Sequence, residues 1–334
     1  MTEPKPRIGL VGAGGIASAH LPGLLAAAGE LRVFSEAYGP VFGEDAGVRR
    51  ADSLDDLIDW AEIIDVATPS DTHYRIAAQA LTAGRHVICE KPLALRVEDA
   101  AELVALAERR GVRLFPAHVV RYFPAYAEAK RAVDAGALGP LAVMRFVRSG
   151  SFPWQPWFAD TRRSGGVVGD LMIHDFDIAQ WFAGEVVRVS AVRRRLDEGD
   201  RPVEAAHVLL THASGTITQV AGLWGAPDLR FGTEFSVTGT LGALTYSSAA
   251  EENYVVDPAH LVTGSNFLPA READDDDPYT REITSFVAAC LGGPAPRVDA
   301  SDGLEAVRIA VAALTSIGTG QPVDLARRVT GAQP

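Results

Sequence analysis

Cysteine is scarce in this chain: only Cys89 and Cys290 occur among 334 residues. Two cysteines so far apart exclude a disulfide framework and a CxxC metal site, and they suit a reducing, cytoplasmic setting. The opening stretch MTEPKPRIGLVGAGG lacks the basic start, apolar run and cleavage site of a secretory signal peptide. No apolar run approaches the length of a membrane span. We therefore expect a cytoplasmic protein that has no membrane partner.

Clusters of basic residues are also lacking. The formal net charge is −12, which argues against nucleic acid as a partner and leaves small-molecule substrates open. The acidic stretch READDDDPYT, residues 271–280, is expected to be a solvated loop because its acids do not have the spacing of metal ligands. Hydrophobic and charged contents of 47% and 22% are those of an ordinary globular protein. The length suits two domains.

Strand and helix patterns alternate through the first third of the chain. Short apolar runs predict strands at residues 7–13, 31–37, 63–69, 86–92 and 112–118. Amphipathic segments between them predict helices at residues 15–29, 53–61, 72–84 and 96–111, with Ser53 as an N-cap and Gly111 closing the last. Strands and helices in this order, joined by short loops, predict an α/β domain with a doubly wound parallel sheet.

The pattern changes after residue 121. Strands are expected at residues 140–150, 186–196, 205–212, 215–224, 231–238 and 242–247, and helices at 123–139, 169–184, 280–291 and 301–317. We assign residues 1–121 to the first domain and residues 122–334 to an α+β domain with an open, mostly antiparallel sheet. Because an open sheet commonly buries its uncovered face against a second subunit, we expect a homodimer or homotetramer formed through this sheet.

The turn after the first expected strand has a G-x-G-x-x-A pattern, Gly12-Ala13-Gly14-Gly15-Ile16-Ala17. Gly12 permits the tight turn, Gly14 lets the backbone approach a pyrophosphate, and Ala17 lets the helix pack closely on the strand. Backbone amides of Gly14, Gly15 and Ile16 and the helix dipole then hold the phosphates. Because the turn heads a strand–helix–strand series, we predict a dinucleotide site. The alternative is a glycine-rich turn without a ligand.

An acid at the end of the second strand is expected to bind the ribose hydroxyls of the dinucleotide. Glu36 lies about 20 residues past the turn, with Ser35 beside it. No Arg or Lys follows through residue 47, and a carboxylate repels a 2′-phosphate, so NAD is favoured while NADP is not excluded. The alternatives are that Ser35 faces the ribose, or that Glu36 is a surface acid at a strand end.

The fourth expected strand ends in Glu90, Lys91 and Pro92. Residues at the carboxyl edge of a parallel sheet face the ligand crevice. A lysine beside a bound nicotinamide can donate a hydrogen bond to a substrate hydroxyl oxygen and stabilise the negative charge that develops there. Taken alone, a Glu-Lys-Pro tripeptide is more often a surface turn.

Three aspartates and a histidine occur among apolar residues in GDLMIHDFD, residues 169–177. On an α-helix with Asp170 at zero, His174 lies at about 40° and Asp177 at about −20°, so these three share one face. Asp175 falls within the apolar arc, where a carboxylate needs an arginine or a backbone N–H as partner.

Asp170 can simply be a helix N-cap, because acids commonly begin helices. This alternative does not explain His174, since a cation near a helix N-terminus is disfavoured and the imidazole is expected to stay neutral. A neutral imidazole is what a general base requires. Asp170, one turn earlier, can orient the ring and stabilise the imidazolium once it forms.

The glycine turn, ATPSDTH (67–73), VICEKPLA (87–94) and GDLMIHDFD occur in that order. Together they closely resemble the glucose–fructose oxidoreductase/inositol dehydrogenase/rhizopine catabolism (Gfo/Idh/MocA) family, most strongly up to about residue 185. The resemblance implies an NAD(P)-binding Rossmann domain in residues 1–121 and a substrate-binding and oligomerisation domain in residues 122–334. It also implies NAD(P)-dependent oxidation of sugars, inositols or related polyols.

The resemblance implies roles for single residues. Cofactor contacts are implied for Thr68, Pro69, His73, Glu90 and Lys91, in addition to the glycine turn and Glu36. His174 removes the hydroxyl proton, Lys91 polarises the same oxygen, Asp170 supports His174, and a hydride passes to C4 of the nicotinamide. No metal is required, and the sequence has no clustered His or Cys set that would supply one. The alternative for His73 is local packing at a helix start.

The loop SFPWQPWFADTRRSGG, residues 151–166, is implied by the resemblance to border the substrate. Trp154, Trp157 and Phe158 offer flat faces to sugar C–H groups, and Arg162 and Arg163 offer contacts to hydroxyls or carboxylates. Substrate contacts are expected from Arg121, Trp157 and Arg162, together with Lys91, Asp170 and His174. The alternatives are that Arg121 is structural and that the tryptophans fill a domain interface.

Two other functions are compatible with a Rossmann domain. One is a sensor that binds NAD(P) without catalysis, and the presence of both Lys91 and His174 counts against it. The other is an NAD-dependent glycosidase or epimerase-type enzyme that oxidises its substrate only transiently. Net production of NADH separates a dehydrogenase from that class.

Overall fold

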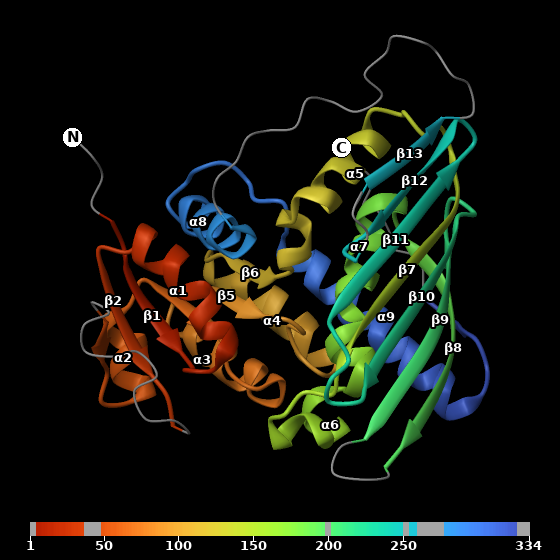
Figure 1. Ribbon diagram of the computed structural model, residues 1–334. Coiled ribbons are helices and arrows are strands. Elements are labelled where there is room, and N and C mark those ends of the chain that lie inside the picture. Colours follow the sequence, from red (N-terminus) through yellow and green to blue (C-terminus); the bar gives the residue numbers. More distant parts are fainter. Residues whose placement is uncertain (1–4, 37–47, 198–201, 250–253, 259–276, 326–334) are drawn as a thin grey trace. The chain divides into compact units, whose positions relative to one another are not determined.

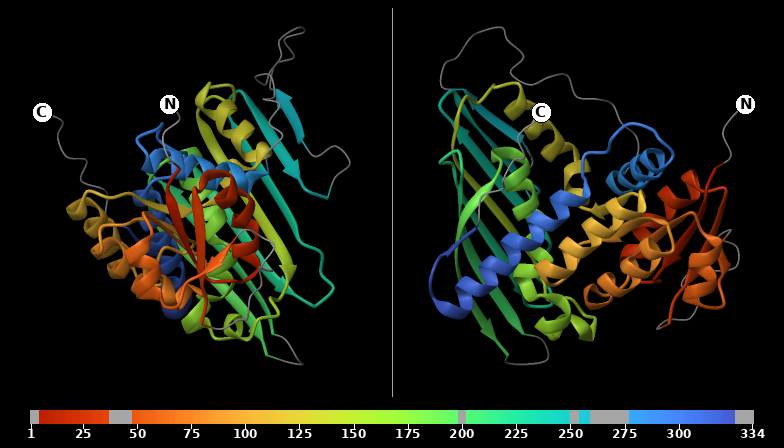
Figure 2. Two further views of the ribbon diagram at one scale, coloured as in Figure 1. Left: turned by 90° about the vertical axis from the view of Figure 1, so that its left-hand side faces the viewer. Right: turned by 180° about the vertical axis from the view of Figure 1, so that it is seen from behind.

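The computed structural model describes residues 5–36, 48–197, 202–249, 254–258 and 277–325. The expected ribose-side segment 37–47 and most of the expected acidic loop lie outside these ranges. The chain forms two compact units, one with residues 1–124, 162–164 and 273–307, the other with residues 125–161, 165–272 and 308–334. Each unit contains one sheet, drawn in Figure 1 and from two further sides in Figure 2.

The first unit is built on a six-stranded sheet of order β3-β2-β1-β4-β5-β6, in which every neighbouring pair is parallel. Its strands are β1 (Arg7–Val11), β2 (Glu30–Phe34), β3 (Arg49–Arg50), β4 (Ile63–Val66), β5 (His86–Glu90) and β6 (Leu114–Ala117). The expected parallel sheet is confirmed. Strand order reverses between β1 and β4, and ligands of such sheets bind beside this point at the carboxyl edge.

Helices connect the strands of this sheet: α1 (Gly15–Ala27), α2 (Leu54–Trp60), α3 (His73–Thr82) and α4 (Val97–Arg110). The Ser53 hydroxyl accepts the amide N–H of Asp56 at 3.0 Å, as a helix N-cap does. Gly111 ends α4 with φ of 66°, in the left-handed region that favours glycine. Both expected helix boundaries are therefore confirmed.

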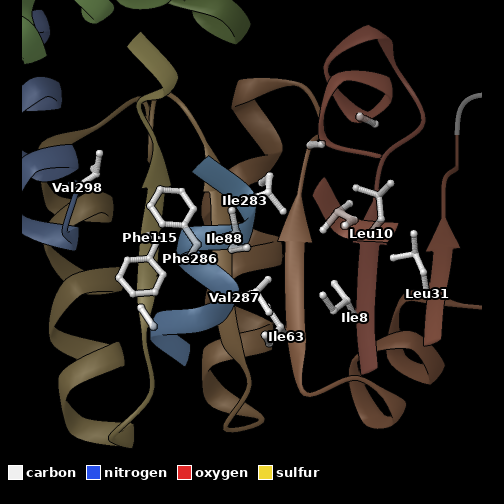
Figure 3. Close-up of a cluster of buried hydrophobic side chains, with 14 of the residues drawn as sticks. Ile8, Leu10, Leu31, Ile63, Ile88, Phe115, Ile283, Phe286, Val287 and Val298 are labelled. Carbon is white, nitrogen blue, oxygen red and sulfur yellow. The ribbon is translucent and has the colours of Figure 1, made fainter. Parts of the chain in front are cut away.

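A late segment of the chain returns to the first unit. Helix α8 (Pro278–Cys290) packs on α1, where a Cβ at Gly23 would lie 2.8 Å from that of Ile283. Phe286 is fully buried and stacks on Phe115 of β6 with ring centroids 5.0 Å apart (Figure 3). The expected second domain, residues 122–334, therefore includes a part that the structure assigns to the first unit, because α8 buries its apolar face there.

The second unit is built on an eight-stranded sheet of order β13-β12-β11-β7-β10-β9-β8-β14. Its strands are β7 (Leu141–Ser151), β8 (Val186–Leu196), β9 (Val203–His212), β10 (Ile217–Gly225), β11 (Gly232–Gly239), β12 (Gly242–Ser247), β13 (Tyr254–Pro258) and β14 (Val323–Asp324). Among the described strands of this sheet, only β7 and β10 pair in parallel, so the expected mostly antiparallel sheet is confirmed.

Successive residues of these strands point to opposite faces of the sheet. On the inner face, Phe235 of β11 contacts Tyr126 and Phe182, and Phe146 of β7 contacts Phe182. These two come from helices α5 (Pro124–Asp134) and α7 (Ile173–Ala183). The short α6 (Thr161–Ser164) precedes α7, and α9 (Ala300–Thr319) contains the division between the units. Within the described ranges, no helix is long and apolar enough to cross a membrane.

Candidate active site

The glycine turn follows β1 and has the backbone that the sequence predicts. Gly12 has φ of +111°, its N–H donates to the Phe34 carbonyl at 2.9 Å, and a Cβ there would lie 2.3 Å from the Ala67 oxygen. Only glycine fits this position. No described atom lies within 4 Å of the place a Cβ would take at Gly14 or Gly15. The turn is therefore closed against the strands and open where a ligand would approach.

This open side suits the pyrophosphate of NAD. Gly14 is the extended residue before α1, so the amides of Gly15 and Ile16 begin the helix and have no intrahelical acceptor. Helix N-termini of this kind bind phosphate through their free amides. Glu36 is exposed two residues past the end of β2, the strand beside β1, in the expected position for a ribose contact. The residues present thus fit a dinucleotide.

Gly12→Ala and Gly14→Ala should separate folding from binding. The first places a methyl group against backbone and should lower the free energy of unfolding by about 2 to 4 kcal/mol. The second leaves the fold nearly unchanged but occupies the space for the pyrophosphate, so the Kd for NAD should rise about tenfold or more. Denaturant unfolding and NAD titration of both variants test this pair. Equal losses of stability in the two variants would contradict it.

The Thr68–Pro69 turn follows β4 and is tied to the lysine turn by His73. This side chain is buried, with Nδ1 2.8 Å from the Pro92 carbonyl oxygen and Nε2 2.8 Å from the Thr68 oxygen. Both contacts are hydrogen bonds only when both ring nitrogens carry protons. These contacts favour the local-packing alternative for His73, because the ring links the turn after β4 to the turn after β5.

Lys91 directly follows β5 and is half-buried, before a cis peptide bond to Pro92. Glu90 points inward: Oε2 accepts the backbone N–H of Lys91 at 2.9 Å, and Oε1 lies 3.1 Å from His20 Nε2. Burial alone would raise the pKa of Glu90, but the hydrogen bond and charge of His20 lower it. Both oxygens of the Glu90 carboxylate therefore have protein partners, and a cofactor contact by Glu90 stays a prediction.

Arg121 also has protein partners. It lies in a short helical turn after β6, with its side chain only 3% exposed. One guanidinium nitrogen donates to Asp302 at 3.0 Å and to the Arg297 carbonyl at 2.7 Å. These contacts favour the structural alternative, because the returning segment of the chain supplies acceptors that the local sequence does not reveal, and a substrate contact by Arg121 stays a prediction.

In the second unit, Asp170 and His174 do not lie on one regular helix. Asp170 belongs to a π-helical turn, Val167–Leu171, in which the Met172 N–H donates to the Val167 carbonyl. Helix α7 begins after this turn, with Met172 at its N-cap and His174 in its first turn. The expected start of an α-helix at residue 169 and the alternative of an N-cap at Asp170 are therefore wrong, and an α-helical projection does not apply across the junction. Such π turns occur frequently at functional sites.

Asp175 has the partner that its apolar surroundings predict. Arg148 of β7 donates to its carboxylate at 2.7 and 3.2 Å, and both side chains are buried. Burial alone would lower the pKa of Arg148, but the charge of Asp175 raises it. The pair fixes the first turn of α7, which also carries His174, to the sheet.

Arg148→Met should be strongly destabilising because it leaves the Asp175 carboxylate buried without a cation. Losses of about 3 to 5 kcal/mol are typical when one partner of a buried ion pair is removed. The double variant Arg148→Met/Asp175→Leu should recover most of this loss. Denaturant unfolding measures both, and a single variant as stable as the wild type would contradict the inference.

The aromatic loop before α6 forms a stacked set within the second unit. Trp157 stacks on Phe158 with centroids 3.8 Å apart, and Phe158 meets Trp224 edge-on at 5.8 Å. Trp154 is 69% exposed. In the segment assigned to the first unit, Arg162 is exposed and Arg163 pairs with Asp71 at 2.8 Å. Substrate contacts by Trp157 and Arg162 stay predictions.

The sequence patterns did not indicate one part of the site, a buried histidine between two acids. His20 of α1 lies between Asp65 of β4 and Glu90, and all three are buried. The available signal was Asp65, an acid within the otherwise apolar strand IIDV. Among the described residues, no cluster of His, Cys, Asp and Glu has the geometry to hold a metal.

Comparison with known proteins gives the family. Residues 6–118 match the oxidoreductase family with an NAD-binding Rossmann fold, and residues 126–245 match the GFO/IDH/MocA C-terminal domain. Inositol 2-dehydrogenase of Rhizobium meliloti is 27% identical over 96% of this chain and 99% of its own. D-apiose dehydrogenase of Paraburkholderia graminis is 31% identical over 88% of this chain and 80% of its own.

A solved structure agrees over the whole length. The crystal structure of GenD2 from gentamicin A biosynthesis, in complex with NAD, superposes with a TM-score of 0.82 at 27% identity, covering 98% of each chain. Its cofactor is the one that the glycine turn and Glu36 of this chain favour. The chain therefore belongs to the GFO/IDH/MocA family of NAD-dependent oxidoreductases.

Proposed function

We propose that the protein is a dehydrogenase that oxidises a hydroxyl group of a sugar, an inositol or a related polyol with NAD. The observation that carries the proposal lies in the first unit. The glycine turn after β1 and the lysine after β5 stand at the same carboxyl edge of one parallel sheet, with only β4 between their strands. A lysine in that position suits an oxygen that reacts beside the nicotinamide.

The proposed chemistry divides between two residues. NAD, when bound, supplies the ring carbon that accepts a hydride. His174 takes the proton from the substrate hydroxyl, and the Lys91 ammonium donates a hydrogen bond to the same oxygen as the C–H bond breaks and the carbonyl forms. Asp170 orients the imidazole and stabilises its protonated form. The hydroxyl carbon loses a hydride and the oxygen a proton, so one carbonyl and one NADH result.

The substrate class rests on the names of relatives and on the aromatic loop. Relatives over most of this chain are named for inositol, scyllo-inositol and D-apiose. Trp157, stacked on Phe158, offers a flat face of the kind that packs on sugar C–H groups. A neutral polyol or aldose with several adjacent hydroxyls is thus the proposed substrate.

A panel of cyclitols, aldoses and sugar alcohols tests the proposal, each assayed with NAD and NADP at the absorbance of the reduced nicotinamide. We expect reduction with at least one polyol and a higher kcat/KM with NAD. Tight NAD binding without reduction of any substrate would favour a sensor. Substrate conversion without net NADH would favour a glycosidase or epimerase-type enzyme.

We further propose that the open face of the second sheet joins two copies of the chain. Its outward side chains include Val192, Leu209 and Ile217, which are 66%, 42% and 43% exposed. Adjacent exposed apolar side chains on a sheet face mark an interaction surface. A shallow hollow crosses the same face over four neighbouring strands, β7, β10, β9 and β8. Homodimers or homotetramers are the proposed assemblies.

Leu209→Asp should shift the protein towards monomer at micromolar concentration, because a carboxylate in a paired apolar face is left without a partner. Leu25→Asp is the matched control: Leu25 is also 42% exposed but lies on α1 of the first unit. Sedimentation velocity compares the two variants with the wild type. A wild type that is monomeric, or equal behaviour of both variants, would contradict the proposed interface.

The cytoplasm is the proposed location. Cys89 and Cys290 are free thiols, as a reducing compartment favours. Burial raises the pKa of Cys89 well above its usual range, so this thiol is not reactive. Fractionation of the source cells with an antibody checks the location.

A further inference from the structure

A buried histidine lies beneath the lysine turn of the first unit. His20, in the second turn of α1, places Nδ1 2.9 Å from Asp65 Oδ2 and Nε2 3.1 Å from Glu90 Oε1. The side chains of His20 and Asp65 are fully buried, and that of Glu90 is 6% exposed. Three ionisable groups from α1, β4 and β5 are therefore enclosed together.

The imidazole in this cluster carries both protons. Each ring nitrogen faces a carboxylate oxygen, and a neutral ring can donate to only one of them. Burial by itself lowers the pKa of His20, but the charges and hydrogen bonds of Asp65 and Glu90 raise it well above its ordinary value. One cation thus separates two buried acids that would otherwise repel each other.

The cluster continues directly to the lysine. The second oxygen of Glu90 accepts the backbone N–H of Lys91 at 2.9 Å, so the orientation of the Glu90 carboxylate sets the start of the lysine turn. His20 fixes that orientation from α1, the helix that begins at the glycine turn. On the far side of the turn, His73 holds the Pro92 carbonyl.

We propose that His20 is a positioning residue: its imidazolium orients Glu90 and thereby holds Lys91 at a fixed place relative to the glycine turn. The proposal rests on the proposed function for the role of Lys91 in catalysis. A misplacement of a reacting group by about 1 Å can cost about 100-fold in rate. His20 would act through Lys91 and not through direct contact with cofactor or substrate.

A purely structural role is the competing explanation. Burying two acids and a cation is costly, and well-packed apolar residues often stabilise such a site equally well or better. What the charged set adds is a fixed orientation of the Glu90 carboxylate, because Oε1 accepts from His20 Nε2 and Oε2 accepts from the Lys91 N–H. The test must therefore distinguish loss of stability from loss of orientation.

His20→Gln, Glu90→Gln and the double variant make this distinction. In His20→Gln two acids face each other without a cation, so exchange of the Lys91 amide should accelerate about tenfold or more and kcat should fall about 10- to 100-fold. In the double variant one acid is gone. The side-chain amide introduced at position 90 can still accept the Lys91 N–H and donate to the amide introduced at position 20. Amide exchange and kcat should therefore both recover at least half of the loss on a logarithmic scale.

His86→Gln is the matched control. His86 starts the same strand β5 at its other end, where Nδ1 accepts the Arg113 amide at 2.9 Å. This variant should leave the kcat and the exchange of the Lys91 amide within about twofold of the wild type. The Kd for NAD should change less than about threefold in all the variants, because the glycine turn keeps its backbone.

Hydrogen-exchange mass spectrometry of the peptide that contains Lys91, steady-state kinetics and NAD titration supply the readouts. His20→Gln with a wild-type kcat and an unchanged Lys91 amide would overturn the proposal, as would a loss in Lys91→Ala/His20→Gln that equals the product of the single losses. If Lys91→Ala alone stays fully active, the proposed function fails, while amide exchange still decides whether His20 holds the lysine turn. If His20→Gln fails to fold, the double variant, provided that it folds, decides instead. Exchange of its Lys91 amide as slow as in the wild type supports the proposal, and fast exchange overturns it.

Discussion

Lys91→Ala should lower kcat for NAD reduction by about 10³-fold while the Kd for NAD stays within about threefold. The expected size follows from the loss of one charged donor to an oxygen that becomes negative in the transition state, an effect of about 10²- to 10³-fold in comparable sites. Binding should persist because the phosphates are held by the glycine turn, which does not involve the lysine side chain. Steady-state kinetics and NAD titration on the purified variant measure both quantities.

Two further variants make this result specific. Lys91→Arg keeps the charge but replaces a compact ammonium by a planar fork, so it should recover only part of the rate. Lys130→Ala, on α5 of the second unit, removes a lysine that pairs with Asp134 and lies over the Trp181 ring. It should retain wild-type kcat. Lys91→Ala with more than a tenth of the wild-type rate would refute the role proposed for the lysine.

Much of the fold follows from local patterns. The alternation of short apolar runs with amphipathic segments predicts the parallel sheet, because strands buried on both faces are apolar throughout. Ser53 and Gly111 mark helix ends through chemistry confined to a few residues. The return of α8 is different: its amphipathic face shows that the helix is buried but not against which sheet. Only the packing of Phe286 on Phe115 decides that.

The candidate site was predictable where its chemistry is local. The glycine turn depends on backbone space, which the residue types specify directly. Asp175 was expected to need an arginine or a backbone N–H because of its apolar surroundings, yet the sequence could not single out Arg148, 27 residues away. His20 was missed because a histidine in an apolar helix has the pattern of an ordinary core residue.

The predicted and observed surroundings of three further site residues differ because of side-chain direction, distant partners and local backbone geometry. Glu90 stands next to Lys91 in sequence, but successive side chains of an extended segment point to opposite sides, so the two side chains have different surroundings. Arg121 is buried by Asp302 and by the Arg297 carbonyl, which lie far along the chain. The π turn at Asp170 closes an i→i+5 hydrogen bond, from the Met172 N–H to the Val167 carbonyl, so it holds more residues per turn than an α-helix. Spacing alone cannot separate these cases.

His174→Ala should lower kcat by about 10²- to 10⁴-fold, the range typical for loss of a general base. The hydroxyl proton then has no nearby acceptor, so the hydride cannot leave without generating a protonated carbonyl. Added imidazole should restore part of the rate in His174→Ala, in proportion to its concentration, and should not affect Lys91→Ala. Steady-state rates against imidazole concentration measure this rescue, and thermal unfolding confirms that the variant is folded.

Asp170→Asn tests whether Asp170 acts through His174, as proposed. Alone, this variant should lower kcat by about tenfold or more, since a neutral amide stabilises the imidazolium less than a carboxylate does. In the His174→Ala background the same change should add little, because no imidazole is left to orient. Full additivity of the two losses would instead assign Asp170 a separate contact with the substrate. A wild-type rate in His174→Ala would remove the general base from the mechanism and leave proton transfer to solvent.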